Sequence, residues 1–219
     1  MVKTYSNKKD GATQITPHFK VSEFACKDGT DKILIDVDGV KKLELMRIWA
    51  GASIRINSGY RTAEYNKRAG GSPTSKHVQG RAWDIIITGK TPAQGAKFAQ
   101  LIGFTGIEVN RDKNYLHVDT RTTSHLYWTH TGGKDITTSS FGGLCPYKMP
   151  SAALRRGSRG DSVKWLQFHL AVWELYAGKI DGSFGAQTEA AVKDFQALTG
   201  LDVDGHVGPA TRNKLRGAI

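Results

Sequence analysis

Cysteine is scarce in this sequence, which contains only Cys26 and Cys145 in 219 residues. No CxxC pair is present, so cysteine-based zinc sites and thioredoxin-type chemistry are excluded. The sequence leaves open whether the two thiols pair or stay free. Long apolar runs are also missing, and none approaches the ~20 residues that a membrane-spanning helix requires. We therefore expect no insertion into a membrane.

Acidic residues are outnumbered by basic ones, with 20 Asp and Glu against 31 Lys and Arg, a net charge of +11. Such a charge suits a polyanionic partner, whether nucleic acid, an anionic membrane or an anionic cell wall. A dispersed, solvated surface explains it equally well. No dense Lys/Arg block or base-reading motif is present, so we expect no nucleic-acid partner.

Residues 139–160 are rich in Gly, Pro, Ser and Arg, the composition of a linker. We therefore predict two domains, residues 1–150 and 151–219. The second contains a repeat, because IDGSFGAQT at 180–188 recurs as VDGHVGPAT at 203–211. In each copy Asp-Gly predicts a turn and the final Thr predicts a helix start near its cap. With the apolar helical spacing of 163–173, the repeat predicts a compact three-helix unit.

This second domain resembles the peptidoglycan-binding domain of bacterial and phage wall hydrolases. The resemblance covers 154–219 and is carried by both DGxxG turns, by the Leu-Gln at 166–167 and by AVKDFQ at 191–196. It implies non-catalytic attachment to bacterial peptidoglycan. We expect Asp181 and Asp204 to build turns rather than contact glycan. We expect four residues to form the core: Trp165, Leu166, Phe195 and Leu198.

Three residues in the first domain, His77, Asp84 and His117, are candidate ligands of a catalytic zinc ion. Such a site uses three protein ligands and leaves a fourth position for water, and one carboxylate among them is chemically sound. AWDIII at 82–87 predicts a buried strand that fixes Asp84, and Gly80 permits a close bend after His77. The other histidines are not predicted ligands: His18, His125, His130, His169 and His206.

YLHVD at 115–119 predicts a second strand. Because side chains alternate along a strand, Tyr115, His117 and Asp119 share one face. A strand that directs His117 at a metal therefore also directs Asp119 toward the site.

SKHVQGRAWD at 75–84 is similar to the S-x-H-x-x-G-x-A-x-D signature of the zinc DD-carboxypeptidase family, whose relatives include vancomycin-resistance dipeptidases, L-alanyl-D-glutamate endopeptidases and the Hedgehog domain. Further similarity, over roughly 17–130, is carried by FKVSEFACKDG at 19–29, RINSGYRTAEYN at 55–66 and YLHVDTR at 115–121. The resemblance implies one zinc ion bound by His77, Asp84 and His117. It also implies hydrolysis of a peptide bond in peptidoglycan stem peptides or cross-links.

The resemblance implies roles for residues around the metal. Asp119 is the first candidate for the general base, and orienting a ligand histidine is its alternative role. Relatives carry an acidic residue three positions before the last ligand, where this chain has Asn114, so Glu108 is the second candidate base. Arg61 resembles the family arginine that neutralises substrate or oxyanion charge, with a surface salt bridge as its alternative.

Four more residues near these motifs have two alternatives each. Ser75 is expected either to bind substrate or to cap the turn before His77. Tyr115 is expected either to line the site or to pack against it. Trp83 and Trp128 are predicted at the core or rim, with a platform for substrate as their alternative role.

The expected architecture is an α+β catalytic domain, with a small, mostly antiparallel sheet and helices at 37–51, 62–70 and 91–103, followed by the three-helix domain. Thr91 and Pro92 are predicted as the cap and first residue of the third helix. We expect a monomeric, endolysin-like enzyme. Residues 1–14 lack the apolar core of an export signal, so it is expected to reach the wall by phage-type lysis or another export route. The competing hypothesis is a non-catalytic wall-binding protein that retains a structural metal site.

Overall fold

The computed structural model describes residues 1–217. Residue contacts divide the chain into two compact units, one of residues 1–99 and 104–141, the other of residues 100–103 and the chain from Gly142 onward. The predicted boundary at residue 150 stays a prediction. The expected mixture of sheet and helices is confirmed. In the part of the chain that the structure describes, no helix combines the length and apolarity needed to cross a bilayer.

The first unit contains the strands and the early helices. In chain order these are β1 Val2–Ser6, α1 Asn7–Asp10, β2 Gln14–Thr16, β3 Phe19–Lys20, the 3-10 helix η1 Val21–Phe24, β4 Lys32–Asp36, α2 Val37–Ala50, β5 Ile54–Ser58, α3 Ala63–Arg68, β6 Ala82–Ile87, α4 Pro92–Leu101, β7 Gly106–Asn110, β8 Tyr115–Asp119, β9 Leu126–Thr131 and β10 Lys134–Thr138. The three predicted helices correspond to α2, α3 and α4.

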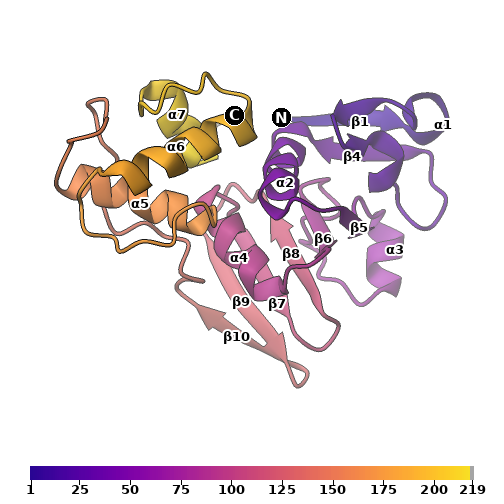
Figure 1. Ribbon diagram of the computed structural model, residues 1–219. Helices are drawn as coiled ribbons and strands as arrows, with labels where there is room; N and C mark the ends of the chain where they lie inside the picture. The colour runs from indigo at the N-terminus through magenta and orange to yellow at the C-terminus, as the bar shows by residue number, and fades with distance from the viewer. Residues whose placement is uncertain (218–219) are drawn as a thin grey trace. The chain divides into compact units, whose positions relative to one another are not determined.

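A six-stranded sheet in the order β10-β9-β7-β8-β6-β5 forms the centre of this unit (Figure 1). Its neighbouring strands run antiparallel except for β7 and β9, which are parallel. Two short antiparallel pairs, β1 with β4 and β2 with β3, lie outside it.

One face of the sheet forms the hydrophobic core, and helices α2 and α4 cover it (Figure 1). Its side chains alternate with those of the site face, as on any strand with one buried side. Trp83 on β6 and Leu116 on β8 are each 1% exposed. The helices approach closely through two glycines: a Cβ at Gly39 of α2 would lie 2.1 Å from the Trp83 ring, and one at Gly95 of α4 would lie 2.8 Å from Leu116.

Local sequence signals explain where these helices begin and end. Thr62 caps α3, since its hydroxyl accepts the Tyr65 N–H at 3.1 Å. At α4, the Thr91 hydroxyl accepts the Gln94 N–H and the Gln94 side chain accepts the Thr91 N–H, a reciprocal capping box. Helix α2 ends at Gly51, whose φ of +60° favours glycine.

The second unit contains α5 Asp161–Val172, α6 Ala186–Thr199 and α7 Pro209–Leu215. Its two repeats use the same interaction. The Gln167 amide donates to Asp181 Oδ1 at 2.9 Å and accepts the Gly182 N–H, and the Gln196 amide repeats both contacts with Asp204 and Gly205. Asp181 and Asp204 therefore stabilise turns.

The second unit departs from the prediction in two details. Thr188 and Thr211 lie at the start of a helix as expected, but α6 and α7 begin two residues earlier, so both side chains are buried in the first turn. Their hydroxyls donate to carbonyls of the preceding turn, those of Ser183 and His206. Leu198 is 43% exposed rather than core, whereas Trp165, Leu166 and Phe195 are buried.

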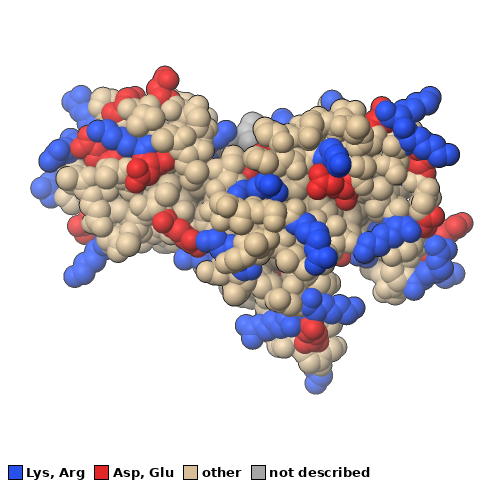
Figure 2. Space-filling model, turned by 45° about the vertical axis from the view of Figure 1, so that its right-hand side comes forward, with Lys and Arg blue, Asp and Glu red and all other residues tan. Residues whose placement is uncertain are grey.

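Basic side chains are dispersed with acidic ones between them on the face shown in Figure 2. The sequence leaves the pairing of the thiols open, and Cys26 and Cys145 are both free.

Candidate metal centre

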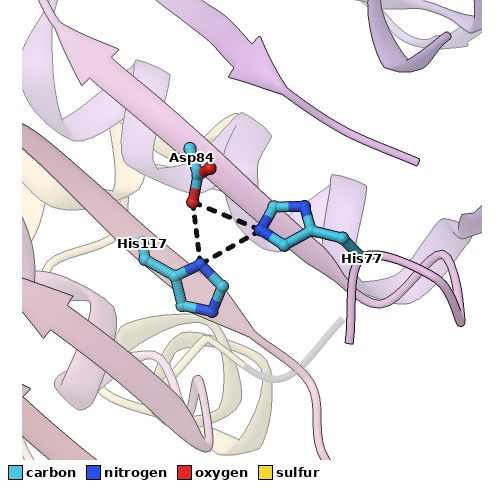
Figure 3. Close-up of side chains that lie close together, drawn as sticks. All are labelled: His77, Asp84 and His117. Atoms are coloured by element: carbon cyan, nitrogen blue, oxygen red, sulfur yellow. Dashed lines mark hydrogen bonds and ion pairs between the residues drawn. The ribbon is translucent and has the colours of Figure 1, made fainter. Parts of the chain in front are cut away.

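His77, Asp84 and His117 bring one ligand atom each to a common point on the open face of the sheet (Figure 3). His77 Nε2 lies 3.3 Å from His117 Nδ1 and 3.3 Å from Asp84 Oδ1. His117 Nδ1 lies 2.8 Å from Asp84 Oδ1. Two strands and the loop before β6 therefore converge on one small triangle of nitrogen and oxygen atoms.

The triangle has the dimensions of a tetrahedral metal site. Ligand atoms bound at ~2.0–2.1 Å to a tetrahedral zinc ion stand about 3.3 Å apart. Two of the three separations have this value. The third, between Asp84 and His117, is a hydrogen-bond distance that an ion between them would widen. Two imidazoles and one carboxylate also form a donor set suited to zinc.

His77 lies in the loop before β6, and a backbone carbonyl fixes the orientation of its ring. Its Nδ1 donates to the Gly59 carbonyl at 2.8 Å, which leaves the Nε2 lone pair directed at Asp84 and His117. Burial lowers the pKa of His77, so the ring is neutral, as a ligand must be. Gly80 closes this loop with φ +67°, and a Cβ there would lie 2.4 Å from the Leu34 carbonyl oxygen.

His117 directs Nδ1 at the triangle, whereas His77 directs Nε2 there. The second ring nitrogen of His117 contacts Asp119. His117 Nε2 lies 3.4 Å from Asp119 Oδ2. Burial alone would lower the pKa of His117, but the carboxylates of Asp119 and Asp84 outweigh it and raise the pKa to about 9. A cation must displace this proton to bind.

Asp119 is fully buried, and Arg121 forms hydrogen bonds to both of its carboxylate oxygens. Arg121 binds it through both carboxylate oxygens, with Nε 2.9 Å from Oδ1 and Nη2 against Oδ2. The Arg121 backbone N–H adds a third contact to Oδ1. Although burial favours the neutral acid, these bonds hold the pKa of Asp119 well below its usual range. The Asp119 carboxylate therefore has His117 on one side and Arg121 on the other.

The site follows one row of directly opposed residues across the sheet. Ser58 on β5 faces Asp84 on β6, Asp84 faces His117 on β8, and His117 faces Glu108 on β7. Glu108 in turn faces Trp128 on β9. Opposed residues have Cβ atoms only about 5 Å apart and point to the same face. The register of the sheet therefore places Glu108 beside the ligand His117.

Glu108 is less enclosed than Asp119. Both carboxylates border the cavity above the triangle, but Glu108 is only partly buried, whereas Asp119 is fully buried. Its Oε1 accepts the Asn110 side-chain amide at 2.7 Å and lies 3.5 Å from the Tyr115 hydroxyl. Within residues 1–217 no arginine or lysine forms an ion pair with it. This carboxylate faces the space that a substrate would enter.

Arg61 contacts the candidate ligand Asp84 directly. Its Nη2 donates to Asp84 Oδ2 at 2.6 Å and its Nε donates to Ser58 Oγ at 2.7 Å. Burial raises the pKa of Asp84, but hydrogen bonds from His117 and His77 hold it well below its usual range. Asp84 is therefore a charged ligand whose second oxygen Arg61 binds.

The three ligands lie in a cavity of about 510 Å³ that Ser75, Tyr115 and Trp128 also line. Tyr115 therefore lines the site. The Trp128 ring packs 5.7 Å from His117, centroid to centroid, whereas Trp83 lies in the core. The Ser75 carbonyl accepts the Val78 N–H in the turn around His77.

Sequence reasoning missed several contributors to the site. They are Ser58, Gly59, Asn110 and Arg121. Ser58 and Gly59 belong to the S-G-Y-R segment and Arg121 to YLHVDTR, but their partners lie on other strands, so only the sheet register reveals their contacts.

Comparison with known proteins adds to this geometry. Residues 17–119 match the family model "Peptidase M15" and residues 159–215 match "Putative peptidoglycan binding domain". The chain is 45% identical over 67 residues to the zinc D-Ala-D-Ala carboxypeptidase of Streptomyces albus G, covering 30% of this chain and 26% of that protein. It is 38% identical over 69 residues to a spore cortex-lytic enzyme of Oceanobacillus iheyensis, covering 32% of this chain and 25% of that protein.

A third relative is covered over most of its length. The chain is 42% identical over 87 residues to an uncharacterized protein in the bpoA1 3' region of Kitasatospora aureofaciens, covering 39% of this chain and 74% of that protein. Among solved structures, the SleB N-terminal domain is 38% identical, covering 31% of this chain and 93% of that one, with a TM-score of 0.31. The matches to the two enzymes thus span about a quarter of each enzyme's length.

Proposed function

Because the chain belongs to the peptidase M15 family, we propose that it is a zinc-dependent peptidase that hydrolyses a peptide bond in bacterial peptidoglycan. The observation that carries this proposal is the convergence of His77, Asp84 and His117 on one point at the wall of an open cavity. Structural zinc sites are closed by four protein ligands, whereas catalytic sites keep one position open. A three-ligand set beside a cavity favours catalysis over the non-catalytic alternative.

We propose distinct roles for the two carboxylates near the ligands. A zinc ion held by the three ligands would polarise the scissile carbonyl and lower the pKa of a bound water. Glu108 faces the cavity, and we assign it proton transfer from the attacking water to the leaving amine. Asp119 accepts a hydrogen bond from the His117 Nε2–H and so keeps Nδ1 available as the ligand atom. This replaces our sequence-based preference for Asp119 as the base.

Arg61 has a double role in this proposal. Its bond to Asp84 Oδ2 supports a role in holding that carboxylate with Oδ1 toward the ligand triangle. Two of its five N–H groups are used by Asp84 and Ser58. Since Arg61 also lines the cavity, its other N–H groups are available to a substrate oxygen. Ser75 and Tyr115 line the same cavity and are proposed to contact the substrate.

We further propose that residues 151–219 form a wall-binding domain that attaches a monomeric enzyme to peptidoglycan. The match of residues 159–215 supports this assignment. Attachment raises the local concentration of substrate at the catalytic residues within 1–150. The cell wall is accordingly the proposed site of action, reached by phage-type lysis or by another export route.

The test is digestion of purified peptidoglycan, followed by mass spectrometry of the released fragments. We expect new amino and carboxyl termini from the untreated protein, none after chelation, and recovery when zinc is restored. His77→Ala should release no fragments, while His125→Ala, an exposed histidine away from the ligands, should behave as the unaltered protein. Fragment masses identify the bond, whether D-Ala-D-Ala, L-Ala-D-Glu or a cross-bridge. Wall binding without cleavage across several wall types would overturn the proposal.

A further inference from the structure

A second, smaller cavity adjoins the metal centre. It has a volume of about 260 Å³, and Arg61, Asp84 and Tyr115 line both it and the larger cavity. Its other walls include Lys27, which follows η1 and Cys26, and Lys113, which lies in the turn between β7 and β8. Two segments far apart in the sequence therefore bring ammonium groups to one cavity beside the ligands.

The charges of this cavity are not balanced by the protein. Asp84 is its only carboxylate, and that group is already bound by Arg61. Within residues 1–217, the side chains of Lys27 and Lys113 have no ion pair or hydrogen bond. A lysine pair without an acidic partner at a concave surface attracts an anion, because low-dielectric walls focus the field there.

The neutral groups of the cavity suit the same ligand. Asn57 and the Tyr65 phenol add hydrogen-bond donors to the two ammonium groups. Such a set of donors matches a carboxylate, whose two oxygens accept several charge-assisted hydrogen bonds. A peptide that reaches the metal ligands through the larger cavity can extend past Arg61 and Tyr115 into the smaller one.

We infer that the cavity lined by Lys27 and Lys113 is a subsite that binds a free carboxylate of the peptide substrate, next to the scissile bond. This inference rests on the proposed peptidase function. A stem peptide offers such a carboxylate from two sources, its C-terminus and the α-carboxylate of its D-glutamate. A C-terminal source corresponds to carboxypeptidase action, and an internal one permits endopeptidase action.

The test compares Lys27→Gln/Lys113→Gln with Lys32→Gln/Lys134→Gln in the full chain. The control pair removes the same charge from two exposed lysines outside both cavities. Four synthetic stem pentapeptides are used, with the C-terminus and the D-glutamate α-carboxylate each either free or amidated. Steady-state kinetics gives KM and kcat, and calorimetry on the chelated proteins gives binding without cleavage.

The subsite variant should raise KM and the dissociation constant of the fully free peptide about 10- to 100-fold, the effect of losing charge-assisted hydrogen bonds. Its kcat should stay within about twofold, and the control pair should change neither value. Amidating the carboxylate that the subsite binds should lower the affinity of the unaltered protein for the peptide by a similar factor. The unaltered protein and the variant should then bind that peptide equally. The peptide that shows this effect identifies which carboxylate is bound.

Two results overturn the inference. In the first, the subsite variant and the control pair bind each of the four peptides equally well. In the second, the subsite variant loses as much affinity for the fully amidated peptide as for the fully free one. Absence of cleavage by the unaltered protein would count against the peptidase function instead. Calorimetry still tests the inference in that case. Binding that depends on the carboxylate and is lost only in the subsite variant supports the inference. If no such binding is measured, the inference is overturned.

Discussion

Replacing Glu108 with glutamine should stop proton transfer while leaving the metal ligands intact. Glutamine has the same shape, and its carbonyl oxygen can still accept the Asn110 amide that Glu108 Oε1 now accepts at 2.7 Å. No hydrogen bond joins Glu108 to the three ligands among the described residues. General acid–base catalysis typically contributes 10²–10⁴-fold. We therefore expect kcat to fall by about that factor, roughly 3–5 kcal/mol in the barrier.

The assay pairs kcat on a cleaved wall peptide with the zinc content and zinc affinity of the same protein. Asp119→Asn is the matched comparison, because it also removes one carboxylate beside His117. Loss of a group that orients a ligand histidine typically costs 10–100-fold in metal affinity. We expect Asp119→Asn to bind zinc that much more weakly and to recover kcat at saturating zinc.

The opposite pattern would refute this assignment. If Asp119→Asn keeps full zinc affinity and loses kcat, while Glu108→Gln stays active, Asp119 is the base and the proposed division of roles is wrong.

Three further predictions concern stability, measured by urea denaturation of the full chain. Gly80→Ala should destabilise by about 2–5 kcal/mol, because φ is +67° and the added Cβ would meet the Leu34 carbonyl oxygen; an unchanged midpoint would contradict this. Gln196→Ala should cost about 2–4 kcal/mol, since it leaves the buried Gly205 N–H without its acceptor and removes the donor that holds Asp204 in its turn; a loss below 0.5 kcal/mol, roughly that of an ordinary surface change, would contradict it. Burial lowers the pKa of His169 to about 4, so the unfolded chain takes up a proton first; stability should be complete above about pH 6.5 and fall by roughly 3 kcal/mol toward pH 4, with a flatter profile in His169→Gln.

Several features of the chain follow from its sequence because their causes are local. The Thr91–Gln94 box and Thr62 mark the starts of α4 and α3 through contacts only three residues long. Apolar alternation marks β6 and β8, and the repeated Asp-Gly pairs mark the two turns of the second unit. The long signature around His77 and Asp84 indicates the family before any coordinates are considered.

Local patterns fail where a long-range partner decides the role of a side chain. Thr188 has the residue type of a cap, but the Gln167 side chain and the Ser183 carbonyl draw it into the first turn of α6. Leu198 has helical apolar spacing, yet its side of α6 is left exposed. The sequence cannot tell which stripe of a helix another element will cover.

The sequence by itself determined the kinds of side chain available for a metal site and the strands that carry them. Only the tertiary structure decided what surrounds each carboxylate. Strand periodicity places Asp119 on the face of His117, but burial and the bonds from Arg121 enclose it, whereas the register of β7 against β8 sets a partly buried Glu108 beside His117. The same packing brings Lys27 and Lys113 together across 85 intervening residues. Register and packing are pairwise properties of distant segments, and so neither can be inferred from one segment alone.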